Sequence, residues 1–109
     1  MIDHGISERS MKSLSKLIKN YPSISQVLLY GSRAKGTYYP HSDIDLCLVG
    51  EISFLNLSRI KADFIDSDIP LEVDLCVYSE ITNEALKRSI DLDGIQLGTV
   101  AKNLDLSRV

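Results

Sequence analysis

The spacing of apolar residues changes along the chain and predicts helices that alternate with short strands. Helices are predicted where apolar residues recur three or four positions apart, because these positions share one face of a helix. Each such segment begins at a hydroxyl residue that can cap the first helical turn. The predicted helices cover residues 7–20, from 53 to about 65, and from 82 to about 94.

Strands are predicted where apolar residues run together or alternate with other residues. Residues 26–30 form a short apolar run, whereas residues 43–49 and 71–77 alternate between apolar and other side chains. A glycine turn into a brief helix at residues 31–36 and a loop at residues 37–42 separate the first two strands. The last fifteen residues are expected to form a short strand or a docking tail.

Composition limits the classes of protein that this pattern fits. With 109 residues, 44% hydrophobic and 25% charged, the chain is expected to form a single globular α/β (α+β) domain over residues 1–109. No apolar run approaches the ~20 residues of a membrane-spanning helix. Because the first residues also lack the apolar core of a signal peptide, a cytoplasmic protein without a membrane partner is expected.

Charge and cysteine usage argue against a nucleic-acid-binding protein and against a zinc protein. The formal net charge of −3 combines a basic first third with an acidic remainder. For the basic residues, a solvated amphipathic helix is favoured over a surface that faces phosphate or an acidic partner, and nucleic acid is not expected as a direct partner. Cys47 and Cys76 lack CxxC spacing, which argues against a zinc site and predicts buried, reduced thiols.

Three aspartates lie on the non-aliphatic faces of two predicted strands. Asp43 and Asp45 are two residues apart on one strand, hence roughly 6.6 Å apart on one face, and Asp74 lies in the middle of the next strand. Carboxylates that meet in a sheet repel each other and favour a compensating cation, and hard oxygen ligands suit Mg²⁺ or Mn²⁺. A solvated strand face is the alternative, because the spacing of Asp43 and Asp45 alone is common.

A glycine turn follows the first predicted strand directly. Gly31 allows backbone N–H groups to approach an anion, Ser32 adds a hydroxyl donor, and Arg33 lies beside them. A purely structural turn fits equally well, and the segment is not a P-loop, because no lysine follows the second glycine. In the following loop, Tyr38 and Tyr39 either stack on a base or anchor the loop.

The order of these features resembles the minimal nucleotidyltransferases of the DNA polymerase β nucleotidyltransferase superfamily. The segment GSRAKGTYYPHSDIDLCLV matches their Gly-Ser-Arg turn and paired acids, and LEVDLCVY places Asp74 at the position of the third acid. The resemblance spans residues 24–97 and implies a polymerase-β-like fold, a small mixed β-sheet flanked by helices. It also implies transfer of a nucleoside monophosphate, with AMP from ATP favoured, to an acceptor with release of pyrophosphate.

The resemblance implies a role for each acid. Asp43 and Asp45 would hold the metal ion that bridges the triphosphate. Asp74 would complete a second metal site and help to activate the acceptor oxygen. Two Mg²⁺ ions are therefore the expected cofactors, with Mn²⁺ as the alternative.

Four further residues are implied to bind the nucleotide. Gly31, Ser32 and the adjacent amides would hold the β- and γ-phosphates, and Arg33 would neutralise charge on the leaving pyrophosphate. Ser42 would either position the acidic loop or contact phosphate, and an ordinary turn hydroxyl is the alternative for it.

The resemblance also implies a protein partner, because the chain has no second domain to hold an acceptor. In this family the partner is a small helical protein, and in some toxin-antitoxin pairs AMP is added to a tyrosine of a HEPN-type toxin. A hetero-oligomer with two copies of each chain is expected, or a homodimer when the chain is alone. The alternatives are a nucleotide-binding, non-catalytic subunit that neutralises its partner and a DxD glycosyltransferase, which the short length disfavours.

Overall fold

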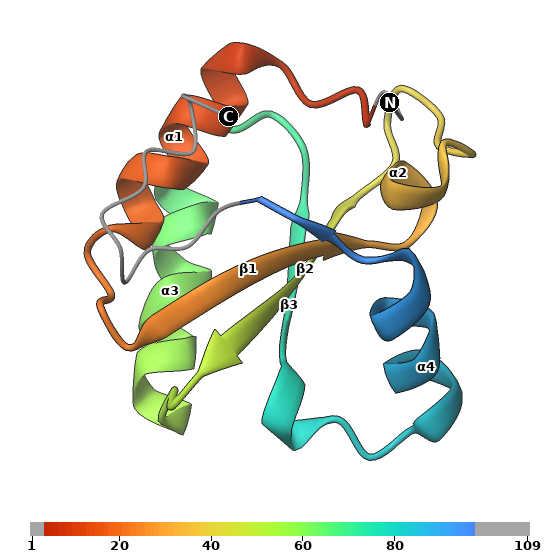
Figure 1. Ribbon diagram of the computed structural model, residues 1–109. Helices are drawn as coiled ribbons and strands as arrows, with labels where there is room; N and C mark the ends of the chain where they lie inside the picture. Colours follow the sequence, from red (N-terminus) through yellow and green to blue (C-terminus); the bar gives the residue numbers. More distant parts are fainter. Residues whose placement is uncertain (1–3, 98–109) are drawn as a thin grey trace.

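A four-stranded sheet in the order β3-β2-β1-β4 forms the centre of the fold in the computed structural model, which describes residues 4–97 (Figure 1). The strands are β1 (Ile24–Tyr30), β2 (Ile44–Gly50), β3 (Val73–Val77) and β4 (Ile95–Gln96). The helices are α1 (Glu8–Ile18), α2 (Ser32–Lys35), α3 (Phe54–Asp66) and α4 (Glu84–Asp93), and a 3₁₀ turn, η1 (Tyr78–Glu80), follows β3.

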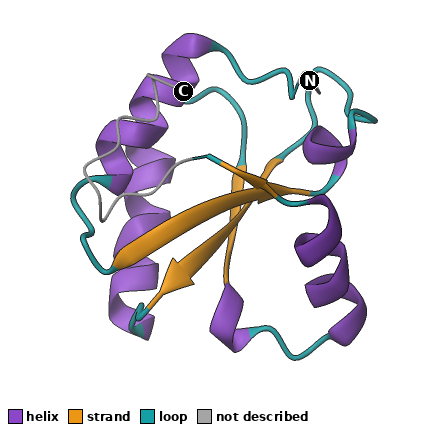
Figure 2. Ribbon diagram, viewed as in Figure 1, coloured by secondary structure: helices purple, strands orange, loops and turns teal. Residues whose placement is uncertain are grey.

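The sheet is mixed, as the family resemblance implies. Strand β1 pairs antiparallel with both β2 and β4, whereas β2 and β3 run parallel. The parallel pair is joined by α3, because parallel neighbours need a crossover rather than a tight turn (Figure 2). The predicted α/β class is therefore confirmed, with helices on both sides of the sheet.

The two faces of the sheet differ in chemistry. Helices α1 and α3 lie together against one face, and α4 lies on the other side (Figure 1). Because side chains alternate along a strand, residues one position apart face opposite helices. The face under α1 and α3 is the apolar core, which contains Val27, Leu29, Ile44, Leu46, Leu48 and Leu75 from the sheet, Leu14, Leu17 and Ile18 from α1, and Ile60 and Phe64 from α3.

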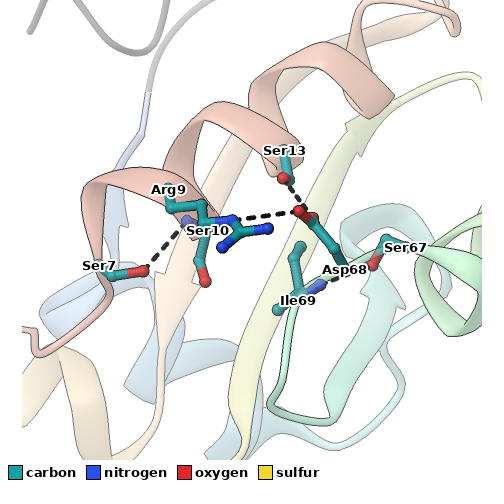
Figure 3. A network of polar contacts seen from close by, with 7 residues as sticks. All are labelled: Ser7, Arg9, Ser10, Ser13, Ser67, Asp68 and Ile69. Carbon is teal, nitrogen blue, oxygen red and sulfur yellow. Dashed lines mark hydrogen bonds and ion pairs between the residues drawn. The ribbon is translucent and has the colours of Figure 1, made fainter.

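Polar contacts attach α1 to the connection between α3 and β3. Ser7 caps α1 by accepting a hydrogen bond from the Ser10 amide at 3.1 Å. One turn further on, the Ser13 hydroxyl donates to Asp68 at 2.6 Å, and Arg9 pairs with the other oxygen of the same carboxylate at 3.4 Å (Figure 3). Asp68 therefore joins two segments that are far apart in the sequence.

Some boundaries differ from those predicted. Strand β1 begins at Ile24, two residues earlier than the apolar run indicated. Helix α4 is capped by Asn83, which accepts from the Leu86 amide at 3.0 Å, rather than by Thr82. Of the last fifteen residues, Ile95–Gln96 form the expected short strand, and residues 98–109 lie outside the described part of the chain.

No helix within residues 4–97 is both long enough and apolar enough to cross a membrane.

Candidate functional site

Asp45 and Asp74 lie side by side on neighbouring strands. Asp45 is the register partner of Asp74 in the parallel pair and of Tyr30 in the antiparallel pair. Register partners point to the same face, about 4.5–5.5 Å apart across the sheet. These three side chains therefore form one row on the face opposite the apolar core, with Asp45 in the middle.

The charges in this row act on each other. Asp45 is half-buried, and burial is the main cause that raises its pKa, followed by the charges of Asp74 and Asp43. Asp43 thus lies near enough to repel Asp45, although it precedes the first residue of β2. The other two acids that the sequence singled out therefore both act on Asp45, and a cation beside them would relieve the repulsion.

The donor set fits a hard divalent cation. Asp43 and Asp74 are exposed, so their oxygens are accessible to an ion and to a substrate. Within residues 4–97, no three His, Cys, Asp or Glu side chains are already arranged as a metal site. Proteins commonly bind Mg²⁺ through one or two carboxylates together with substrate phosphates.

The glycine turn packs directly against the central acid. Gly31 has φ +75°, and a Cβ at this position would collide with Oδ2 of Asp45 and lie 3.1 Å from its Cγ. Only a glycine allows this backbone conformation and this approach together. Ser32, half-buried, begins α2 immediately afterwards, so Gly31 and Ser32 lie beside the acidic row.

The Arg33 guanidinium is turned towards main-chain oxygens. The side chain is 1% exposed and donates to the carbonyls of His4 at 3.0 Å, Pro40 at 3.3 Å and Ser42 at 3.0 and 3.2 Å. It also stacks over the Tyr38 ring, 4.7 Å from the centroid. These main-chain partners hold the loop before β2 through Arg33.

Ser42 and Tyr38 complete this loop. The Ser42 hydroxyl accepts from the Tyr39 amide at 2.8 Å, which closes the turn just before Asp43. The Tyr38 ring lies against Gly5, where an added Cβ would collide with it. Of the two roles considered for Tyr38, its contacts are those of a loop anchor, whereas Tyr39 is 77% exposed.

Sequence reasoning did not connect Tyr30 and the two cysteines with the site. Cys47 and Cys76 are register partners one row along from Asp45 and Asp74. Hydrogen bonds from Cys47 and from the Tyr30 hydroxyl lower the pKa of Cys76 to about 7, against the opposing effect of burial. Burial, followed by the interaction with Cys76, raises the pKa of Tyr30. The available signal was alternation, which placed both cysteines on the same strand faces as the acids.

A cleft of about 330 Å³ opens beside Cys76. Leu57 of α3, Leu86 of α4 and the β3 residues Cys76 and Val77 line it. The cleft thus reaches the face of the sheet that carries the acids, from the side of η1.

Comparison with known proteins gives the chain its relatives. Residues 12–102 match the family described as polymerase beta, nucleotidyltransferase. The probable protein adenylyltransferase MntA of Haemophilus influenzae is 39% identical over 73 residues, which are 65% of this chain and 60% of that protein. The chain therefore spans less than two thirds of the length of this curated relative.

Solved structures share the fold at low identity. A toxin-antitoxin crystal structure with AMP-PNP gives a TM-score of 0.68 at 20% identity, over 85% of this chain and 76% of that chain. The complex of a tri-AMPylated Shewanella oneidensis HEPN toxin with MNT antitoxin gives a TM-score of 0.63 at 17% identity, over 93% of this chain and 80% of that chain.

Proposed function

We propose that this chain, which belongs to the polymerase beta nucleotidyltransferase family, transfers AMP from ATP to a hydroxyl of a partner protein. The observation that carries the proposal is the register of Asp45 with Asp74 on parallel strands, directly beside the Gly31 turn. Acids in one row next to a glycine turn can bring a metal-bound triphosphate and an acceptor oxygen to the same place.

The three acids would divide the work of the reaction. Asp43 and Asp45 would hold one Mg²⁺, and Asp74 would help to hold a second and orient the acceptor hydroxyl. When bound, the two ions supply Lewis-acid stabilisation of the attacking and leaving oxygens. Mn²⁺ has similar ligand preferences and could replace Mg²⁺ in both positions.

The glycine turn would bind the phosphates. The backbone amides after Gly31, together with the Ser32 hydroxyl, are well suited to the β- and γ-phosphates, because they lie beside the acidic row. Arg33 and Ser42 would act as positioning residues that hold the loop leading into Asp43. This assignment follows their observed contacts with main-chain atoms.

The acceptor that fits best is a tyrosine of a HEPN-type toxin. The tyrosine oxygen would attack the α-phosphorus of ATP, lose its proton, and displace pyrophosphate as AMP becomes attached. Two relatives support this choice. The Haemophilus influenzae protein is a probable protein adenylyltransferase, and one solved complex contains an AMPylated HEPN toxin. The chain would then act as the antitoxin in a hetero-oligomer with two copies of each protein.

The proposal is tested by incubating the chain with the protein product of the adjacent gene, Mg²⁺ and each of the four α-³²P-labelled nucleoside triphosphates. We expect label from ATP on the partner, lost with Asp45→Asn and retained with Asp66→Asn, an exposed acid at the end of α3. Binding of the partner without any label, under conditions in which both proteins are folded, would instead support a non-catalytic neutralising subunit.

A further inference from the structure

Cys47 and Cys76 are paired across the two parallel strands of the site. They are register partners one row beyond Asp45 and Asp74, and both thiols are free. Neighbouring strands are about 4.7–4.9 Å apart, which lies within the Cα separation of about 4.4–6.8 Å that a disulfide spans.

The two sulfurs differ in access. Cys76 is half-buried and lines the cleft of about 330 Å³ between α3, η1 and α4, so a small reagent can reach it. Cys47 is 0% exposed and lies behind it on the inner strand β2. A reagent that enters the cleft therefore meets Cys76 first, and Cys47 is the nearest second thiol.

We propose that Cys76 and Cys47 form a thiol-modification site that reacts with small organic disulfides, such as glutathione disulfide, and closes into a reversible disulfide between β2 and β3. The Cys76 sulfur, after losing its proton, would attack one sulfur of glutathione disulfide and release one glutathione. Cys47 would then lose its proton, attack the Cys76 sulfur and release the second glutathione. Two protein thiols are oxidised, and one glutathione disulfide is reduced to two glutathione molecules.

The bond would act on the acids two residues away. Closing it brings the sulfurs to about 2.05 Å, which draws β2 and β3 together at that row. Asp45 and Asp74 are held by the same two strands, roughly 6.6 Å along them, so their carboxylates would shift relative to each other. This consequence rests on the proposed function: oxidation of the two thiols is expected to slow AMP transfer at least tenfold, and reduction is expected to restore it.

The chemistry is tested first without reference to activity. The full chain is incubated with glutathione disulfide and analysed by intact mass and peptide mapping. We expect both thiols to disappear, a Cys47–Cys76 linked peptide within one chain, and full reversal by dithiothreitol. If both thiols stay free in the folded chain but react in urea, or if the chains link only to each other, the proposal is wrong.

Single substitutions test the order of the two steps. Cys47→Ser should stop at one glutathione attached to Cys76, whereas Cys76→Ser should leave Cys47 unreacted. If circular dichroism shows that both variants are folded and they react equally with glutathione disulfide, the assigned roles of the two cysteines are wrong.

The transfer assay with oxidised and reduced chain separates this inference from the proposed function. No transfer by the reduced chain would contradict the proposed function and leave the disulfide standing. A disulfide that forms without slowing transfer would overturn the regulatory consequence alone.

Discussion

Gly31 and Asp45 are in direct contact, with the glycine Cα facing the carboxylate so closely that a Cβ would lie 3.1 Å from Asp45 Cγ. The turn that follows β1 and the acid carried by β2 therefore form one surface, although they belong to different segments. The proposed phosphate-binding turn and the proposed metal ligand cannot move independently, because either one sets the space available to the other.

Gly31→Ala is expected to damage both stability and transfer. Its φ of 75° and ψ of −155° suit glycine almost alone, so alanine should cost about 1–3 kcal/mol in urea unfolding. The new Cβ would also displace the Asp45 carboxylate, and transfer should fall at least tenfold. Gly36→Ala is the matched control, since its φ of 78° makes it strained at the other end of α2. If Gly31→Ala transferred AMP as fast as Gly36→Ala, the contact between Gly31 and Asp45 would be contradicted.

The raised pKa of Asp45 makes a prediction about pH. Because its folded pKa lies above its unfolded pKa, the stabilising contribution of protonated Asp45 is present at low pH and is lost as pH rises through the folded pKa. In metal-free buffer, Asp45→Asn should therefore become more stable relative to wild type as pH rises towards 7. In the labelling assay with Mg²⁺, AMP transfer by Asp45→Asn should fall by roughly 100-fold or more relative to wild type.

Thermal unfolding with and without Mg²⁺ checks this prediction. At pH 7, Mg²⁺ should raise the Tm of wild type and of Asp66→Asn more than that of Asp45→Asn. An Asp45→Asn protein that is less stable than wild type at every pH would show that the carboxylate is held by favourable contacts rather than repelled.

Arg33→Lys is expected to loosen the loop before β2. A lysine has no fork of donors to reach the carbonyls of His4, Pro40 and Ser42 together, so unfolding should cost about 2–4 kcal/mol less. The exposed neighbour Lys35 is the control, and Lys35→Met should change stability by no more than about 0.5 kcal/mol. Unchanged stability combined with a raised KM for ATP would favour a phosphate contact for Arg33.

Asp68 should respond to pH in the opposite sense to Asp45. The hydrogen bond from Ser13 is the main cause that lowers the pKa of Asp68. Its stabilising contribution is therefore present above the unfolded pKa and is lost as pH falls through the folded pKa. NMR titration should show the pKa of Asp68 rising in Ser13→Ala and unchanged in Ser58→Ala, an exposed helical serine. An unchanged pKa in Ser13→Ala would disprove the contact.

Strand faces were predictable from the sequence, but strand register was not. Alternation around Asp45 and Asp74 correctly separated the apolar core from the other face, because the period of two is a local property. A slip of two residues would keep the same faces and place Asp43 opposite Asp74 instead. The observed pairing of Asp45 with Asp74 depends on how α3 carries the chain from β2 to β3, which no local pattern specifies.

The burial of Arg33 was not predictable from the sequence either. A charged residue between two glycines indicates solvent or a phosphate, since arginine is rarely buried without partners. Its partners here are main-chain oxygens, which leave no mark on the sequence. The cap of α4 is a smaller case, because Thr82 and Asn83 are adjacent and both can cap, and the backbone path selected Asn83.

The main-chain partners of Arg33 have a consequence for how related sequences can diverge. A carbonyl oxygen is the same in every residue, so positions 4 and 40 can change their side chains without losing the hydrogen bonds to the guanidinium. For these hydrogen bonds, the requirement for one particular side chain falls on position 33 alone. The outer surface of the loop is thus free to adapt to different neighbours over time, while the acids behind it stay in place.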